Sequence, residues 1–501
     1  MSLLRLSLFF LAAHLATALW FVLDRSPGTA AALVGFPLDD AWIHMVYARS
    51  LAALQGFAYN PGQLETGSTS PLWGIVLVPA SWIARAFDVG VVIPAKITTL
   101  LTAAGASLAA ARLLRGLGFG IAVEIAAGLA LAADPALAFA QVSGMEVMLS
   151  SALALWAFGE LAHERYRAAG IAAGLAPLAR PEMAILTVLV LATALWRLHG
   201  GQTSWRTRFG VLLPTVVAVG GWIIYCLAVS GHPLPSTFYV KFAANEDHFV
   251  HNLVLIFAEI LPASPWFTYG TGVVLWVVGA AAAWRRGAVG RMVVAFPLLF
   301  FLGVSASQLL KSAWPFYFLR YVLPAQAFVV AIVAVGAVRL LDWAWRRRRL
   351  AFAPAYAIGV GVVIVGSLAK LPSALIERAH LFSWNCQNIE ELNVAMAVWL
   401  RDNVPAGESI VVNDAGASRY FGEHPILDIV GLNHHRWLHR DPRAGAELAR
   451  ARYGAFFPSL IPQMTTDPGW QQIHRTSTQN LTVCHCDQSE IVAFRRVLPP
   501  R

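Results

Sequence analysis

The sequence contains few charged residues. Only 13% of its 501 residues are charged, whereas 57% are hydrophobic and the mean hydropathy is +0.60. Ordinary soluble domains carry roughly 25% charged residues, so this composition excludes a soluble enzyme. The apolar residues form blocks along most of the chain, and the blocks approach the roughly 20 residues that a bilayer core requires. We therefore expect a polytopic α-helical membrane protein.

Several recognisable motifs are also missing from the sequence. It contains no Walker A or dinucleotide glycine motif, no internal repeat and no low-complexity tract. ATP-driven transport by this chain is therefore not expected. His434, His435 and His439 match no zinc-site spacing, and we interpret them as solvated. We predict no required cofactor, although Asp40 and Glu146 could hold a divalent metal ion.

Cysteines number only four. Cys226 lies inside an apolar block, whereas Cys386, Cys484 and Cys486 lie in the more polar C-terminal part. A disulfide from Cys386 to one of the other two could form if that part faces an oxidising compartment.

The basic residues indicate topology. Lys and Arg exceed Asp and Glu by 37 to 28, and the excess is placed in short arginine clusters between apolar blocks. Such clusters mark cytoplasmic loops, and they do not indicate nucleic-acid binding. All clusters fall on the cytoplasmic side if residues 91–113 span the membrane and residues 71–87 lie in its outer interface. Arg85 and Asp88 fit that placement, because a charge at the bilayer centre costs about 2.5–3.5 kcal/mol.

The predicted architecture has about 11 transmembrane helices and a C-terminal α/β extracytoplasmic domain. The N-terminus is expected to be cytoplasmic, and residues 1–369 form the transmembrane module, with a first outer loop at 24–90. Residues 370–501 form the outer domain, with a helix at 390–403 and strands at 410–412, 426–430, 481–483 and 491–493. The predicted spans are 6–23, 91–113, 119–135, 147–162, 168–180, 182–197, 210–229, 268–284, 290–308, 317–342 and 351–369.

Polar and charged residues are most densely placed in the first outer loop. Asp39 and Asp40 precede an amphipathic helix that runs to Ala52. Either acid could serve as a helix N-cap instead of a catalytic group. Adjacent side chains on a helix point about 100° apart, so the two acids are not expected to share one task. We favour Asp39 as a general base, with Asp40 orienting the acceptor or capping the helix.

Other charges on the predicted outer side are few. Glu146 begins a span, Arg180 and Glu182 flank a proline that breaks a helical hairpin, and Lys241 and Arg320-Tyr321 follow later. An interfacial anchor is the alternative for each of them. A lipid-linked phosphate at this depth would need cations, and we favour Lys241 and Arg320 for it, with Arg180 as a third. We interpret Lys311 as an anchor and His44 as structural.

Taken together, these motifs resemble the C-superfamily membrane glycosyltransferases, and most closely the mycobacterial terminal arabinofuranosyltransferase group. The resemblance covers the whole chain in the expected order. The matching segments are Asp39-Asp40-Ala41, Tyr47-Ala48-Arg49, Leu51-Ala52, Gly56, Asn60-Pro61-Gly62, Glu65, Ser70-Pro71-Leu72-Trp73, Gly144-Met145-Glu146, Ala179-Arg180-Pro181-Glu182, Leu234 to Lys241, Arg320 to Pro324, Asn413 to Ala417 and Leu427 to Leu432.

The resemblance implies transfer of a sugar from a polyprenyl-phosphate donor to a glycan, lipid or protein acceptor, with inversion, on the outer face of a bacterial cytoplasmic membrane. It implies Asp39 or Asp40 as the base and Glu146 as a second acid in the cavity. Tyr47 and Glu65 of the same signature are expected to contact substrate. Val46 stands where an arginine commonly precedes Tyr-Ala, which leaves the sugar and the acceptor open.

The alternative from another class is a transporter or flippase for a lipid-linked or small anionic solute. It would also need a charged cavity and broken helices. It does not account for paired acids followed by an interfacial helix, nor for a sizeable outer domain, and we therefore favour the transferase.

Overall fold

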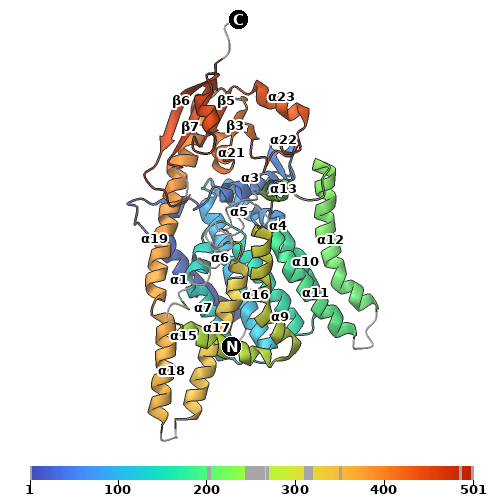
Figure 1. The fold of residues 1–501 in the computed structure, drawn as a ribbon, viewed down its shortest axis with the longest axis vertical. Coiled ribbons are helices and arrows are strands. Elements are labelled where there is room, and N and C mark those ends of the chain that lie inside the picture. The colour runs from blue at the N-terminus through green and yellow to red at the C-terminus, as the bar shows by residue number, and fades with distance from the viewer. Residues whose placement is uncertain are drawn as a thin grey trace.

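The computed structural model describes residues 3–199, 205–242, 266, 270–309, 320–348, 352–483 and 488–497. It is a bundle of helices with a sheet-containing domain stacked on one end (Figure 1). Short helices lie between these two parts, among them α3 (Asp40–Ala52), α4 (Pro71–Val76) and α13 (Ser236–Phe242).

Seven of the described helices are long and apolar enough to cross a membrane, which confirms a polytopic helical protein. Shorter apolar helices accompany them, so the count of about 11 spans stays a prediction. The seven are α1 (Leu3–Val22), α6 (Val92–Gly116), Pro181–His199 including α11 (Ala184–His199), α12 (Trp205–Ser230), Gly287–Val304 of α16 (Gly287–Leu309), α17 (Leu323–Arg346) and Pro354–Asn403. The shorter helices of the bundle are α7 (Ile121–Ala133), α8 (Pro135–Ala140), α9 (Val147–Ala162), α10 (Tyr166–Ala179) and α15 (Thr271–Trp284).

The predicted break between two helices lies where the sequence places it. Helix α10 ends at Ala179, and Arg180 has an extended backbone with φ −156° and ψ 131°. Pro181–Met183 then form one 3-10 turn before α11 begins. A proline cannot donate a backbone hydrogen bond and restricts the residue before it to extended conformations. The break therefore leaves Arg180 projecting from a non-helical backbone.

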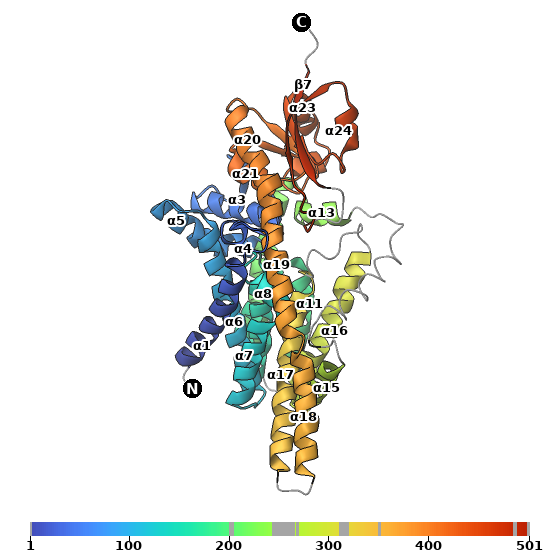
Figure 2. The ribbon, with the colours of Figure 1, turned by 90° about the vertical axis from the view of Figure 1, so that its left-hand side faces the viewer.

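The segment 71–87 forms two short helices, α4 and α5 (Val78–Phe87), instead of one span. In Figure 2, α5 projects sideways from the bundle close to the level of α3. Trp82, Ile83 and Phe87 expose large apolar side chains, and Asp88 ends the helix with a left-handed φ of 49°. These features suit an interfacial helix, and its place at a membrane surface stays a prediction.

A long helical rod joins the bundle to the sheet domain (Figure 2). Helix α18 (Ala353–Leu368) is followed by α19 (Leu371–Ile389), a π-helical turn at Glu390–Val394 and α20 (Ala395–Asn403). The expected domain boundary near residue 370 therefore falls within nearly continuous helix. Helix α19 also contacts α1, α2 (Ala31–Val34) and α8, so the rod belongs to both parts of the molecule.

The sheet domain has five strands in the order β4-β3-β5-β7-β6. Strand β3 (Ile410–Val412) pairs in parallel with β4 (Ile426–Asp428) and β5 (Tyr453–Phe456), placing Val412 beside Asp428 and Ala455. Strand β7 (Glu490–Arg496) is antiparallel to β5 and to β6 (Trp470–Ser477). The remaining elements are the hairpin β1 (Ala58–Asn60) and β2 (Gln63–Leu64), and the helices α21 (Gly416–Gly422), α22 (His435–Leu438), α23 (Pro442–Arg450) and α24 (Pro462–Thr466).

Three of the four predicted strands overlap strands of this sheet, whereas the prediction for 481–483 is wrong. Asn480 is buried there, and its side chain donates to the carbonyl of Trp384 and accepts from the backbone of Thr482 at 3.2 Å. This turn chemistry keeps the segment out of the sheet. Asn480-Leu481-Thr482 also fits the N-glycosylation sequon, but the Asn480 side chain is buried.

Small residues allow α15 and α17 to approach closely. A Cβ atom added to Gly279 would lie 2.0 Å from the carbonyl oxygen of Ile332, and one added to Gly336 would lie 1.8 Å from that of Leu275. Without a hydrophobic driving force between helices in lipid, such close backbone contact is a main source of association.

We expect Gly336→Ala to destabilise the protein by about 1–3 kcal/mol, because the added methyl group forces α15 and α17 apart. The measurement is the thermal unfolding midpoint of the purified full chain in detergent. Gly359→Ala is the matched control, since nothing lies within 4 Å of its added Cβ atom. Equal midpoints for the two variants would contradict this account of the packing.

Candidate active site

The two adjacent acids of the first loop point to different partners. Asp39 is buried, and its carboxylate accepts hydrogen bonds from the backbone N–H groups of Gly416 at 2.6 Å and Ala417 at 2.7 Å. Its side chain does not cap its own helix α3. Asp39 instead binds the first turn of α21 in the sheet domain. The side-chain cap of α3 by Asp39 that the sequence suggested is therefore not made, and this carboxylate instead caps a helix that begins 377 positions later in the sequence.

Asp39 also faces a second carboxyl group, that of Asp414. The two side chains share a hydrogen bond, and Asn393 donates to Asp414 at 2.7 Å. Burial raises the pKa of Asp39, while its bonds to Asp414, Ala417 and Gly416 lower it. Burial and the charge of Asp39 raise the pKa of Asp414 well above its ordinary value. A hydrogen bond between two carboxyl groups requires a proton, and we place that proton on Asp414.

Asp40 points toward the bundle. Its side chain is 40% exposed, and one oxygen lies 2.6 Å from Nη1 of Arg320. Arg320 is itself buried, and its guanidinium lies 5.2 Å from the ring centroid of Tyr321. Asp40 therefore combines access to solvent with a cation fixed at ion-pair distance.

A second arginine shares the ring of Tyr321. The Arg180 guanidinium lies 4.8 Å from the ring centroid and pairs with Glu146 at 2.5 Å and Glu182 at 3.4 Å. Arg180 and Glu146 are both buried. The other oxygen of Glu146 lies 3.2 Å from Nε2 of His44, one turn after Asp40 on α3.

These side chains form one network, which we call the acid–arginine cluster. It brings together the start of α3, the start of α9, the break between α10 and α11, and the residues just before α17. The cluster consists of Asp40, His44, Glu146, Arg180, Glu182, Arg320 and Tyr321.

The sequence indicates a structural role for His44, yet the structure places it in this network, 3.2 Å from Glu146. The signal that could have identified it is its spacing of four residues from Asp40, which places both side chains on one face of a helix.

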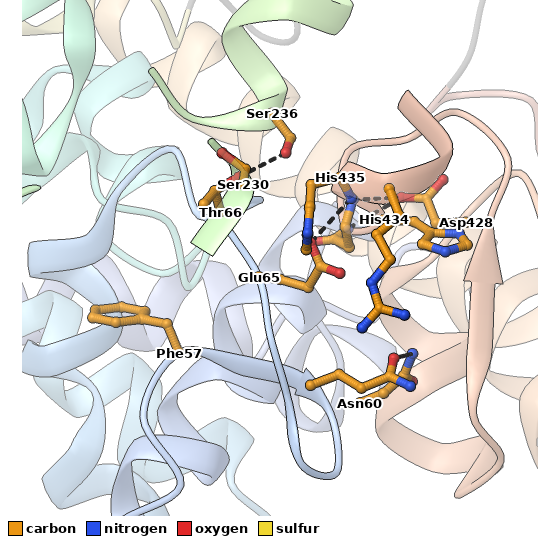
Figure 3. Close-up of polar contacts among 12 residues, drawn as sticks. Phe57, Asn60, Glu65, Thr66, Ser230, Ser236, Asp428, His434 and His435 are labelled. Atoms are coloured by element: carbon orange, nitrogen blue, oxygen red, sulfur yellow. Dashed lines mark hydrogen bonds and ion pairs between the residues drawn. The ribbon is translucent and has the colours of Figure 1, made fainter. Parts of the chain in front are cut away.

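Tyr47 and Glu65 contact the sheet domain in this structure. The Tyr47 hydroxyl donates to Asn433 at 2.9 Å, and Glu65 accepts from the backbone and ring N–H groups of His435 at 3.1 and 2.8 Å. Figure 3 shows Glu65 reaching toward His435 beside Asp428. Asp428 fixes the turn by accepting from three backbone N–H groups, those of residues 430, 431 and 433.

Further residues of the loop join the same interface. The side-chain amide of Asn60 donates to the backbone carbonyl of Ile426 and accepts from its backbone N–H, both at 2.9 Å. At the edge strand β4, this side chain thus makes the pair of hydrogen bonds that a neighbouring strand would make. The Tyr59 hydroxyl donates to the carbonyl of Ala415, and Arg49 donates to that of Tyr420 at 3.0 Å. The first outer loop therefore binds the sheet domain and also contains Asp40.

Helices α12 and α13 are tied to the same loop. The Tyr225 hydroxyl donates to the carbonyl of Glu65 at 3.0 Å, and the hydroxyls of Thr66 and Ser236 lie 2.7 Å apart (Figure 3).

Lys241 is near the end of α13, but its side chain lies outside the described residues, as do Lys311, Cys484 and Cys486. Cys386 is buried, and its proposed disulfide stays a prediction. Among the described residues, no three or more His, Cys, Asp or Glu side chains are grouped so that they could hold a metal ion.

A family model described as a domain of unknown function (DUF8728) matches residues 385–489, from the end of α19 into the sheet domain. No curated protein matches the sequence. Among solved structures, ArnT from Cupriavidus metallidurans, bound to undecaprenyl phosphate, superposes with a TM-score of 0.59 at 15% identity, covering 97% of each chain. The chain has the fold of the C-superfamily (GT-C) membrane glycosyltransferases.

Other solved GT-C structures also align. The archaeal oligosaccharyltransferase AglB from Archaeoglobus fulgidus, in complex with an inhibitory peptide and a dolichol-phosphate, has a TM-score of 0.50 at 12% identity and covers 90% of this chain and 70% of its own. The arabinofuranosyltransferase AftD from Mycobacteria aligns with a TM-score of 0.44 at 15% identity, over 91% of this chain and 40% of its own. The predicted GT-C fold is confirmed, whereas the closer placement among arabinofuranosyltransferases stays a prediction.

The Asp39–Asp414 pair predicts a pH dependence. The pKa of Asp414 is higher in the folded state than in the unfolded state. The protonated Asp414 side chain therefore stabilises the fold fully below the unfolded pKa of about 3.9, and this stabilisation is lost as the pH rises through the folded pKa. Asn at position 414 can still donate to Asp39. We expect Asp414→Asn to raise the thermal unfolding midpoint relative to wild type increasingly as the pH rises from 4 upward.

Asp441→Asn is a control in which the change in stability has the opposite sign. Hydrogen bonds from Arg443 lower the pKa of Asp441, so replacing this carboxylate lowers the unfolding midpoint at neutral pH and not at acid pH. Parallel pH profiles for Asp414→Asn and wild type would contradict the shared proton.

Proposed function

We propose that this chain is a glycosyltransferase that moves a sugar from a polyprenyl-phosphate donor to a glycan, lipid or protein acceptor. The observation that carries the proposal is the partly exposed Asp40 carboxylate held against buried Arg320, with buried Arg180 on the same tyrosine ring. The undecaprenyl phosphate of ArnT and the dolichol-phosphate of AglB support a lipid-linked donor for the shared fold.

Asp40 suits the role of base better than Asp39. A base must reach the acceptor hydroxyl, and Asp40 is accessible, whereas both oxygens of buried Asp39 accept backbone hydrogen bonds from α21. This assignment differs from the sequence expectation, in which Asp39 is the base and Asp40 orients the acceptor or caps the helix. Asp40 takes the hydroxyl proton as the acceptor oxygen attacks the anomeric carbon, a contribution of about 10²–10⁴ in rate. Asp39 positions the helix that carries it.

The arginines would stabilise the leaving phosphate. The bond from the anomeric carbon to the phosphate oxygen breaks as the new glycosidic bond forms, and negative charge then develops on the lipid phosphate. Arg320 offers a guanidinium fork to that charge in a buried setting, where such interactions are strong. Competition between the phosphate and Asp40 for Arg320 would leave Asp40 a better base once the donor is bound.

The remaining predicted site residues fit supporting roles. Glu146 holds both Arg180 and His44, and Glu182 lies against Arg180, so the two acids fix the second cation. Lys241 stays a candidate for the donor phosphate. Single displacement at the anomeric carbon, with base and leaving group on opposite faces, gives the predicted inversion. Substrate contacts by Tyr47 and Glu65 are not part of the proposal, because these side chains bind the sheet domain.

We place the cluster at the outer face of a bacterial cytoplasmic membrane. The arginines that indicate the cytoplasmic side, such as Arg112 and Arg115, lie on the last turns of α6, at the end of the helix away from the first loop. The sheet domain and the cluster then both lie outside, and the N-terminus lies inside. Reaction of engineered cysteines with a membrane-impermeant reagent tests this orientation.

We expect Asp40→Asn to reduce sugar transfer from radiolabelled polyprenyl-phosphate sugars by about 10²–10⁴, because the amide cannot accept the proton. Donor binding should persist. The control is Asp88→Asn, an exposed position with a left-handed backbone that Asn tolerates. Normal turnover by Asp40→Asn would exclude Asp40 as the base, and solute uptake without glycoside formation would favour a transporter.

We expect Arg320→Lys to weaken donor binding by about tenfold, because lysine keeps the charge and loses the bidentate fork. Transfer measured over a range of donor concentrations tests this, with the acceptor KM as an internal control. Unchanged donor dependence would remove Arg320 from the phosphate site.

A further inference from the structure

Two arginines meet on one buried aromatic ring at the end of the bundle away from the sheet domain. Phe119 lies in the turn between α6 and α7. The guanidinium carbon of Arg286, from the turn between α15 and α16, lies 4.9 Å from its ring centroid, and that of Arg339, on α17, lies 5.2 Å away. Two like charges are thus brought together by three separate parts of the chain.

Neighbouring arginines at this end pair with carboxylates, whereas Arg286 and Arg339 form no ion pair within the described residues. Arg112 pairs with Glu160 at 2.5 Å, and Arg115 pairs with Glu124 at 2.5 Å. Within the described part of the chain, neither Arg286 nor Arg339 lies at ion-pair distance from a carboxylate. The Nε atom of Arg339 is buried and has no hydrogen-bond partner there. Among the described residues, these two cations therefore have no carboxylate partner.

The backbone is shaped to admit Arg286. Gly118 has a left-handed φ of 76°, and a Cβ atom added to it would lie 2.7 Å from Nη1 of Arg286. A side chain at this position would require the tip of the Arg286 side chain to shift, and the left-handed backbone favours glycine. The absence of a side chain at Gly118 thus leaves room for the guanidinium of Arg286 beside the Phe119 ring.

We infer that Phe119, Arg286 and Arg339 form a binding site for the headgroup phosphate of an anionic phospholipid. A phosphate matches the guanidinium fork and supplies the missing negative charge. The site lies at an end of apolar helices, where the lipid chains could pack against the bundle while the headgroup sits at the interface. Bound lipid would link the α6–α7 turn, the α15–α16 turn and α17. The inference is independent of the proposed glycosyltransferase activity.

The test uses the purified full chain in mixed micelles of a neutral detergent. Phosphatidylglycerol is titrated while thermal unfolding is followed, and we expect a saturable rise in the unfolding midpoint. Arg286→Gln and Arg339→Gln should each weaken the apparent affinity by about tenfold, the order expected for the loss of charge-assisted hydrogen bonds. Arg348→Gln is the matched control, because Arg348 lies over Trp345 near the end of α17, 4.0 Å from that ring centroid, and it should behave as wild type.

Two further arms identify the ligand. Phosphatidylcholine at the same concentration should give little stabilisation, and inorganic phosphate should give none. Equal stabilisation by phosphatidylcholine or by inorganic phosphate would overturn the anionic-lipid assignment. Wild-type affinity in both Arg286→Gln and Arg339→Gln would overturn the site itself. Arg286 is exposed, so its variant keeps the test valid if Arg339→Gln does not fold.

Discussion

The bond from the Asp39 carboxylate to the first backbone N–H groups of α21 is the contact on which the arrangement of the site depends. It joins the residue just before α3 to the sheet domain, while the next residue, Asp40, reaches Arg320 in the bundle. A carboxylate at a helix start is favourable because it satisfies unpaired N–H groups. Buried between two parts of the molecule, this contact sets the position and the rotation of α3 together.

The rotation of α3 matters because Asp40, His44 and Tyr47, spaced by four and then three residues, lie on one face of the helix, and this face serves both the acid–arginine cluster and the interface with the sheet domain. Asp40 and His44 lie on the face toward the acid–arginine cluster, and Tyr47 reaches Asn433 of the sheet domain. Gly67, in the segment after β2, allows the loop to approach the sheet domain closely, since an added Cβ atom would lie 2.3 Å from the carbonyl oxygen of Leu432. The sheet domain is therefore part of the scaffold of the site and not a separate appendage.

The sequence predicted the helices well because apolar length in a membrane protein leaves few alternatives to helix. The rarity of charges such as Glu146, Arg180 and Arg320 predicts them as site residues, and the structure brings these three side chains together. The partners of Asp39, Tyr47 and Glu65 were missed because they lie 370 or more positions away. Strand β6 was missed because Trp470–Ser477 has no apolar run, being an edge strand paired only with β7 among the described strands.

The division of labour between the adjacent acids follows from the same geometry. A base needs an accessible carboxylate whose pKa and position are controlled by fixed neighbours, whereas an anchor needs a buried one whose oxygens are fully used. Successive residues at a helix start point in different directions, so one dipeptide can supply both. Asp39 binds the sheet domain, Asp40 faces the cations, and the backbone between them transmits the position of one to the other. A displacement of the sheet domain would therefore move the proposed base relative to Arg320, which couples the docking of that domain to proton transfer.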